Sequence, residues 1–211
     1  MTGEPRIPCD DPALPSPTAH KTTETVIDKA ALRKSLAGLR ASIDAPQKTD
    51  WDSAIAARVL AWWGAAHAGE AGPVGVYWPL RGEPDLSVAY AELAASGVRL
   101  ALPVVLARDA ALGFAEWEIG EAMVKDQMGV AVPALLRMVQ RPPVLLIPCL
   151  GFNAGGYRLG YGGGFYDRTL EAAPRPQTVG VAYACQQAEF ASAAHDVALD
   201  LIITQAASLT P

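Results

Sequence analysis

The sequence has little positive charge and no long apolar run, and each shortage excludes a class of protein. Its 211 residues include 17 Lys and Arg against 22 Asp and Glu, which gives a net charge of −5. No broad basic surface is therefore available for nucleic acid or for an anionic membrane, and anionic ligands must be held by a few local cations. Pro, Gly or charged residues interrupt every apolar stretch before it reaches the length that spans a bilayer, so no transmembrane helix is expected.

Cysteine is also scarce. The three cysteines are odd in number and lack the spacing of a metal site, which indicates a reduced, cytoplasmic protein. No histidine accompanies Cys149 in a pattern typical of a nucleophile, so we interpret it as a buried structural thiol. Residues 1–25 are rich in proline and have no apolar signal-peptide core, and we expect them to form a disordered tail.

The remaining residues, 26–211, suit a single α/β domain. Strand-like and helix-like segments alternate along them, which predicts a three-layer sandwich with a mostly parallel central sheet flanked by helices. We expect helices over residues 26–43, from Pro46 or Asp50 onward, and over 79–95. We expect strands at residues 74–78, 98–106, 114–118, 144–147, 178–183 and 201–204.

Residues 144–170 carry the strongest functional signal. The apolar run at 144–147, closed by Pro148, predicts a buried strand. A loop follows that contains Gly155, Gly156, Gly160, Gly162, Gly163 and Gly164, and a helix-like segment begins at Phe165. This order is typical of an anion site, because backbone N–H groups and the positive end of the helix dipole point into one concavity. Arg158 could add a charged fork for phosphate oxygens.

The loop is not one of the common phosphate loops. No glycine precedes a lysine as in a Walker A loop, and Phe165 occupies the third glycine position of a dinucleotide fingerprint. Asp167 has two interpretations: it complements the helix dipole, or it holds a divalent cation together with substrate phosphates. The residues alone leave both open.

The run Arg-Leu-Gly-Tyr-Gly-Gly-Gly-Phe-Tyr-Asp-Arg at residues 158–168 resembles the signature of the 5-formyltetrahydrofolate cyclo-ligases, also called 5,10-methenyltetrahydrofolate synthetases. The similarity extends from about Lys29 to Thr204. It implies the fold shared by sugar-phosphate isomerases and CoA transferases. It also implies ATP-dependent conversion of 5-formyltetrahydrofolate to 5,10-methenyltetrahydrofolate, with phosphorylation of the formyl oxygen, attack by N10, and release of ADP and phosphate.

The resemblance further implies roles for individual residues. The catalytic residues are Arg158 and Asp167, and Mg2+ is held by Asp167 and Asp196. The ATP-binding residues are Lys29, Arg33, Arg158, Leu159, Gly160, Tyr161, Gly162, Gly163, Gly164, Phe165 and Tyr166. The folate-binding residues are Trp78, Glu83, Tyr161, Gly162, Gly163, Gly164 and Phe165.

Structural interpretations remain for several of these residues. Lys29 and Arg33, one turn apart, equally fit a solvated basic helix face. Glu83 and Asp85 could complement the start of the helix expected at 79–95, and Trp78 could be a core residue. His195 and Asp196 are expected to point to opposite faces of an extended segment and so not to act as a unit.

Two positions depart from the family pattern, since Val132 replaces a glutamate and Asn153 an aspartate. Asp200 is the second candidate for the metal carboxylate assigned to Asp196. Two other functions stay open: a same-fold enzyme acting on a sugar phosphate, and a non-catalytic nucleotide-binding module. We expect a cytoplasmic monomer that binds ATP and 5-formyltetrahydrofolate, but neither nucleic acid nor a membrane.

Overall fold

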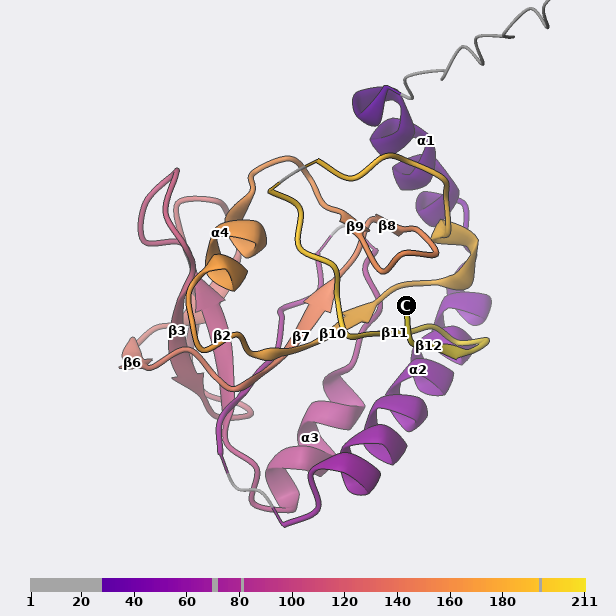
Figure 1. Ribbon diagram of the computed structural model, residues 1–211. Coiled ribbons are helices and arrows are strands. Elements are labelled where there is room, and N and C mark those ends of the chain that lie inside the picture. The colour runs from indigo at the N-terminus through magenta and orange to yellow at the C-terminus, as the bar shows by residue number, and fades with distance from the viewer. Residues whose placement is uncertain (1–27, 70–71, 81, 194) are drawn as a thin grey trace, which may run out of the picture.

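The computed structural model describes residues 28–69, 72–80, 82–193 and 195–211 (Figure 1). The tail expected at residues 1–25 lies outside them. The helices are α1 (Lys29–Ala41), α2 (Ala45–Ala66), α3 (Ser87–Ala95), α4 (Phe165–Glu171) and the 3-10 helix η1 (Ala184–Gln186). The strands are β1 (Val74–Gly75), β2 (Leu100–Val104), β3 (Gly113–Trp117), β4 (Met123–Lys125), β5 (Ala131–Pro133), β6 (Arg137–Val139), β7 (Val144–Pro148), β8 (Gly151–Phe152), β9 (Arg158–Leu159), β10 (Gln177–Val181), β11 (Leu201–Ile203) and β12 (Ser208–Leu209).

Eight of these strands form the central sheet, in the order β12-β11-β10-β7-β1-β2-β3-β6. The run from β11 to β2 is parallel, while β12, β3 and β6 pair antiparallel at the two edges. The short pairs β4–β5 and β8–β9 lie outside this sheet. The predicted mostly parallel α/β sheet is confirmed.

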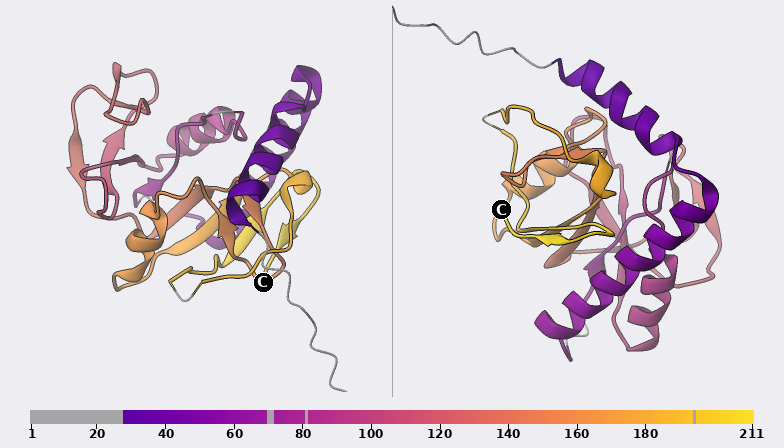
Figure 2. Two further views of the ribbon diagram at one scale, coloured as in Figure 1. Left: turned by 90° about the horizontal axis from the view of Figure 1, so that it is seen from above. Right: turned by 90° about the vertical axis from the view of Figure 1, so that its right-hand side faces the viewer.

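Both faces of the sheet are buried, as the apolar strands predict. Along β7, Val144 and Leu146 pack with α2 and α3 on one face, while Leu145 and Ile147 pack with Leu170 of α4 on the other. Because successive strand residues point to opposite faces, a continuous apolar strand requires cover on both sides. Figure 2 shows α2 and α3 together on one side of the sheet and α4 on the other.

The first helix, α1, belongs to neither layer. Its Leu36 packs with Leu150 and with Leu159 of β9, so α1 lies against the β8–β9 hairpin rather than against the sheet. Asp28 caps the helix by accepting a hydrogen bond from the Ala30 amide at 2.8 Å. This position brings the α1 side chains to the segment that contains the glycines.

The segment expected to start the third helix is not helical. The helix begins at Ser87, and residues 82–86 form a turn followed by irregular chain. Pro84 has no amide hydrogen to donate, and the Glu83 amide instead donates to the Leu80 carbonyl at 2.9 Å. Strand β1 is also shorter than expected, although the Val76 amide still donates to the Ala101 carbonyl at 2.9 Å.

Helix α2 begins earlier than expected, because Asp44 caps it through the Gln47 amide. Its buried face contains Ile55 and Val59, and Trp63 is more deeply buried than its neighbour Trp62. No helix in the described part of the chain is both long enough and apolar enough to cross a membrane.

Candidate active site

The glycine loop follows the carboxyl end of β7. The chain first forms the β8–β9 hairpin, then passes through residues 160–164 into α4. Gly162 and Gly164 have φ angles of +96° and +65°, a region that side chains other than glycine rarely adopt. Gly164 is the N-cap of α4 and provides no side-chain cap to the helix amides. The first amides of α4 therefore have no side-chain cap from Gly164, which leaves them as candidates for contact with a ligand.

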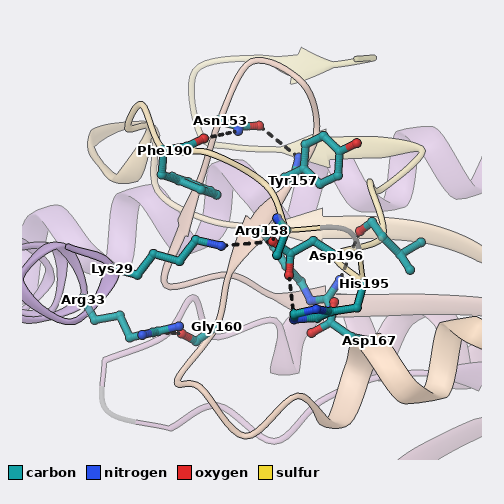
Figure 3. A network of polar contacts seen from close by, with 12 residues as sticks. Lys29, Arg33, Asn153, Tyr157, Arg158, Gly160, Asp167, Phe190, His195 and Asp196 are labelled. Atoms are coloured by element: carbon teal, nitrogen blue, oxygen red, sulfur yellow. Dashed lines mark hydrogen bonds and ion pairs between the residues drawn. The ribbon is translucent and has the colours of Figure 1, made fainter. Parts of the chain in front are cut away.

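Two cations of α1 reach this loop and its surroundings. Lys29 Nζ lies 3.0 Å from Asp196 Oδ2, and Arg33 Nε donates to the Gly160 carbonyl at 2.8 Å (Figure 3). Both side chains are half-buried, so they are not a solvated basic face. The structure brings Lys29, Arg33, the loop and Asp196 together as the resemblance implies.

Arg158 pairs with Asp167 and also contacts the residue that follows Asp196. Its Nη2 lies 2.7 Å from Asp167 Oδ1, and its Nη1 donates to the carbonyl of Val197, the neighbour of Asp196, at 3.3 Å. Only 5% of the Arg158 side chain is exposed, and its guanidinium lies 5.8 Å from the centre of the Tyr166 ring. Arg158 thus links α4 to the segment that precedes β11.

The second acidic residue lies in a turn. Burial acts to raise the pKa of Asp196, but hydrogen bonds from the Ala193 amide and Lys29 outweigh it and hold that pKa below its usual range. The Asp196 amide donates to the Ala193 carbonyl, so the expected extended conformation is wrong. His195 Nε2 accordingly lies 3.7 Å from Asp196 Oδ1 rather than on an opposite face, and 71% of the His195 side chain is exposed.

These carboxylates suit a cation that shares its shell with a ligand. No group of three or more His, Cys, Asp or Glu that could hold a metal occurs in the described ranges. Mg2+ takes one or two carboxylates and completes its shell with phosphate oxygens and water, so Asp167 and Asp196 have the donor chemistry it needs. Asp200 is a poorer candidate, because its carboxylate accepts from the Thr178 amide and hydroxyl and pairs with Arg175.

Glu83 is buried beside the glycine loop. Its Oε1 accepts from the Tyr161 hydroxyl at 3.0 Å, and its Oε2 accepts from the Leu80 amide at 2.9 Å. Of the two acidic residues that could complement the helix start, Asp85 does so by accepting from the Ser87 amide, and Glu83 does not. The loops after β1 and β7 meet because these strands are parallel neighbours, whose carboxyl ends share one edge.

Tyr161 has a second partner that the sequence analysis missed. Arg40 of α1, only 4% exposed, donates a hydrogen bond from Nη2 to the Tyr161 hydroxyl. Burial and the charge of Glu83 raise the pKa of Tyr161, against the opposing effect of Arg40. Arg40 continues the helical stripe of Lys29 and Arg33, which is the one sequence signal that could have identified it.

The other residues singled out in the sequence lie in or beside the core. Trp78 is half-buried against the core and lies edge-on to Trp117 at 5.9 Å between ring centres, which supports its core interpretation. Leu159 is buried in the α1 contact, so only its backbone can face a ligand. Phe165 is half-buried. Burial raises the pKa of the Cys149 thiol to about 12, consistent with a structural cysteine.

The two departures from the family pattern also have structural roles. Val132 is 3% exposed and packs with Val104 and Ala115, an apolar setting that does not suit a carboxylate. Asn153 uses both ends of its amide: Nδ2 donates to the Phe190 carbonyl, and Oδ1 accepts from the Tyr157 amide. An ionised aspartate could not make the first of these bonds.

Residues 25–205 match the family model described as the 5-formyltetrahydrofolate cyclo-ligase family. The curated 5-formyltetrahydrofolate cyclo-ligase of Escherichia coli (strain K12) is 34% identical over 123 residues, which are 55% of this chain and 68% of that protein. The one from Mycoplasma pneumoniae is 51% identical over 59 residues, which are 28% of this chain and only 36% of that protein.

Solved structures agree with this assignment. A 5,10-methenyltetrahydrofolate synthetase from Mycoplasma pneumoniae superposes with a TM-score of 0.71 at 27% identity, covering 85% of this chain and 99% of that one. The Aquifex aeolicus 5,10-methenyltetrahydrofolate synthetase gives the same TM-score at 24% identity, over 86% and 92% of the two chains, and supports the fold. The fold, the glycine loop and the match over residues 25–205 together place the chain in the 5-formyltetrahydrofolate cyclo-ligase family.

Proposed function

We propose that the protein converts 5-formyltetrahydrofolate to 5,10-methenyltetrahydrofolate with ATP, releasing ADP and phosphate. The observation that carries this proposal is the convergence of α1 cations, glycine-loop amides and two carboxylates beside Glu83. The α1 cations and the loop amides would bind a triphosphate. Glu83 would accept hydrogen bonds from a folate. Membership of the cyclo-ligase family supports the same reaction.

The reaction must overcome a poor leaving group. Transfer of the γ-phosphoryl to the formyl oxygen turns that oxygen into part of a phosphate ester. N10 of the folate then attacks the formyl carbon, the C–O bond breaks with phosphate as leaving group, and N10 loses its proton as the ring closes. Phosphoryl transfer needs positioning and charge neutralisation more than covalent help from the protein. The groups around the glycine loop would supply both.

The nucleotide would lie on the loop between Arg158 and Tyr166. The amides of residues 160–164 would donate to phosphate oxygens, and Leu159 would contribute through its backbone. Lys29 and Arg33 would exchange their present partners, Asp196 and the Gly160 carbonyl, for phosphate oxygens. Arg158 is almost fully buried on Asp167, so it would act mainly by fixing that carboxylate next to the γ-phosphate.

Asp167 and Asp196 would hold Mg2+ together with the phosphates. The ion would supply neutralisation of the charge on the transferring phosphoryl group. Without a counter-ion, two carboxylates beside a triphosphate would repel it. Lys29 and Arg158 provide that neutralisation in the ligand-free arrangement, because each forms an ion pair with one of the carboxylates.

The folate would bind on the Glu83 side of the loop. Trp78 and Glu83 both belong to the segment after β1, and Glu83 contacts Tyr161 of the glycine loop. Water must be kept from the phosphorylated intermediate. The aromatic residues Tyr161, Phe165 and Tyr166 would form a partial cover for this purpose.

The test is to mix protein, Mg-ATP and 5-formyltetrahydrofolate and to follow the near-ultraviolet absorbance band of the methenyl product. We expect growth of this band only when ATP is present, with one ADP formed for each methenyl group. Growth that is absent, or that does not depend on ATP, would contradict the proposed function. A protein that binds Mg-ATP without forming product would favour the non-catalytic nucleotide-binding module.

We further propose that the protein acts as a cytoplasmic monomer. All the segments that form the site come from one chain, so no partner copy is needed to complete it. Cys149 and Cys185 are free thiols, as suits a reducing compartment. Light scattering on the eluting peak of a sizing column should give the mass of one chain, 22.2 kDa.

A further inference from the structure

Arg40 is a buried cation that the proposed reaction does not use. It follows Lys29 and Arg33 on one stripe of α1, but at 4% exposure it lies deeper than either. Burying a guanidinium is costly unless charged or polar partners compensate for the lost water. The partners of Arg40 should therefore show what it does.

The hydroxyl of Tyr161 joins Arg40 to Glu83. Arg40 can only donate hydrogen bonds, and an ionised Glu83 can only accept them. The donors and acceptors of the two hydrogen bonds at the Tyr161 hydroxyl are therefore fixed. Arg40 Nη2 donates to the Tyr161 oxygen, and the Tyr161 hydroxyl donates to Glu83 Oε1 at 3.0 Å. The raised pKa of Tyr161 keeps the proton that this second bond requires. The Arg40 guanidinium also lies 5.8 Å from the centre of the Tyr161 ring.

This chain of bonds connects three parts of the site. Arg40 comes from α1, Tyr161 from the glycine loop, and Glu83 from the loop after β1. The Leu80 amide holds the other Glu83 oxygen at 2.9 Å, so the carboxylate is fixed at both ends. Carboxylate oxygens accept hydrogen bonds from N–H donors. A reduced pterin ring presents such N–H donors.

We propose that Arg40 is a positioning residue for the folate substrate, which orients the Tyr161 hydroxyl and through it the Glu83 carboxylate. This inference rests on the proposed function, because that function assigns the folate to Glu83. Arg40 touches neither the nucleotide nor the reacting atoms. Its loss should therefore weaken recognition of the folate and leave recognition of ATP almost unchanged.

The test compares steady-state constants of Arg40→Met, Arg40→Lys and Tyr161→Phe with those of the parent protein. Arg40→Met should raise the KM for 5-formyltetrahydrofolate about tenfold, the effect of losing one hydrogen bond to a charged group. The KM for ATP should change by less than about twofold, because no contact with the nucleotide is lost. Arg40→Lys should recover part of the loss, because an ammonium can still donate to the phenol. Lys34→Met, at an exposed position of α1, is the matched control and should leave both constants unchanged.

A purely structural role would give another pattern. It would lower kcat by reducing the folded fraction, and it would leave the KM for folate at the parent value. That result, or an equal rise in both KM values, would overturn the inference. Tyr161→Phe removes only the hydroxyl and should raise the folate KM by a factor similar to that of Arg40→Met. If Arg40→Met does not fold, Tyr161→Phe and Arg40→Lys carry the test.

A second measurement needs no substrate. Urea unfolding of Arg40→Met, Tyr161→Phe and the double variant forms a double-mutant cycle, and we expect the two changes to be non-additive because they remove the same bond. Additive changes in the free energy of unfolding would show that Arg40 and Tyr161 are not coupled, and would overturn the inference. If the parent protein forms no methenyl product, the proposed function fails. If the parent is active but the folate KM does not respond to Arg40, only the present inference fails.

Discussion

Replacing Asp167 with alanine tests both the packing of the site and its proposed chemistry. The variant loses the carboxylate that pairs with Arg158 and that we assign to Mg2+. Two consequences follow from the structure. The ligand-free protein should become less stable, because a buried guanidinium loses its charged partner, and Mg-ATP should no longer restore stability.

The size of the first effect follows from burial. Arg158 Nη2 and Asp167 Oδ1 are 2.7 Å apart, and their side chains are 5% and 22% exposed. Removing one member of a buried pair typically costs about 3–5 kcal/mol, and the partial exposure of Asp167 favours the lower end, about 3 kcal/mol. The bond from Arg158 to the Val197 carbonyl at 3.3 Å is too long to compensate. With a urea slope of about 2 kcal/mol per molar, the unfolding midpoint should fall by roughly 1.5 M.

The assay is urea unfolding followed by the fluorescence of the five tryptophans, with and without Mg-ATP. At about 100 times its dissociation constant, a ligand stabilises the parent protein by about 2.7 kcal/mol. Asp167→Ala should show almost none of this gain. Glu118→Ala removes the 77% exposed partner of Arg137 and should cost less than about 0.5 kcal/mol, which makes it the control.

Either of two results would refute the reasoning. If Asp167→Ala lowers the free energy of unfolding by less than about 1 kcal/mol, the Arg158 pair does not hold the site together. If Mg-ATP stabilises the variant as much as the parent, Asp167 does not hold the cation.

Three further predictions concern residues around the loop. In steady-state kinetics, Lys29→Met should raise the KM for ATP about tenfold and leave the KM for folate unchanged, because it removes one cation that binds phosphate. Equal rises in both KM values would contradict the assignment of Lys29 to ATP binding. Gly162→Ala, at φ +96°, should lower the free energy of unfolding in urea by about 1–2 kcal/mol and weaken ATP binding. Gly64→Ala inside α2 is the control and should raise the free energy of unfolding by about 0.5–1 kcal/mol. Similar effects at both positions would exclude backbone strain at Gly162. Asp196 has a lowered pKa when folded, so its stabilising effect should be complete above the unfolded value of about 3.9 and be lost as the pH falls through the lower folded value. Urea unfolding between about pH 5 and 2 should then be more pH-dependent for the parent than for Asp196→Asn, and parallel curves would contradict the cause we assign.

Local patterns predicted much of this structure. The apolar run of β7 marked a strand covered on both faces, and the glycines after it marked a loop with left-handed residues such as Gly162. The spacing of Lys29 and Arg33 placed both on one side of α1. These features depend on residues close in sequence, where periodicity and backbone preference act directly.

The errors arose where distant residues determine local structure. Glu83 suggested a helix start, yet its carboxylate is held by Tyr161, 78 positions away in the sequence. Arg40 continues the stripe of Lys29 and Arg33, but only the packing of α1 against the β8–β9 hairpin shows that it is buried. His195 and Asp196 lie in a turn fixed by Ala193 and Lys29 rather than in an extended segment. Such contacts have no signature in the local pattern.

The most direct test of the central claim is nuclear magnetic resonance of protein labelled with 15N at glycine. The main-chain amides of Gly160, Gly162, Gly163 and Gly164 should shift when Mg-ATP is added, and much less when ATP is added without Mg2+. The amide of Gly64, inside α2, should not move. Loop amides that keep their positions at saturating Mg-ATP would show that the nucleotide does not bind this loop, and would contradict the account.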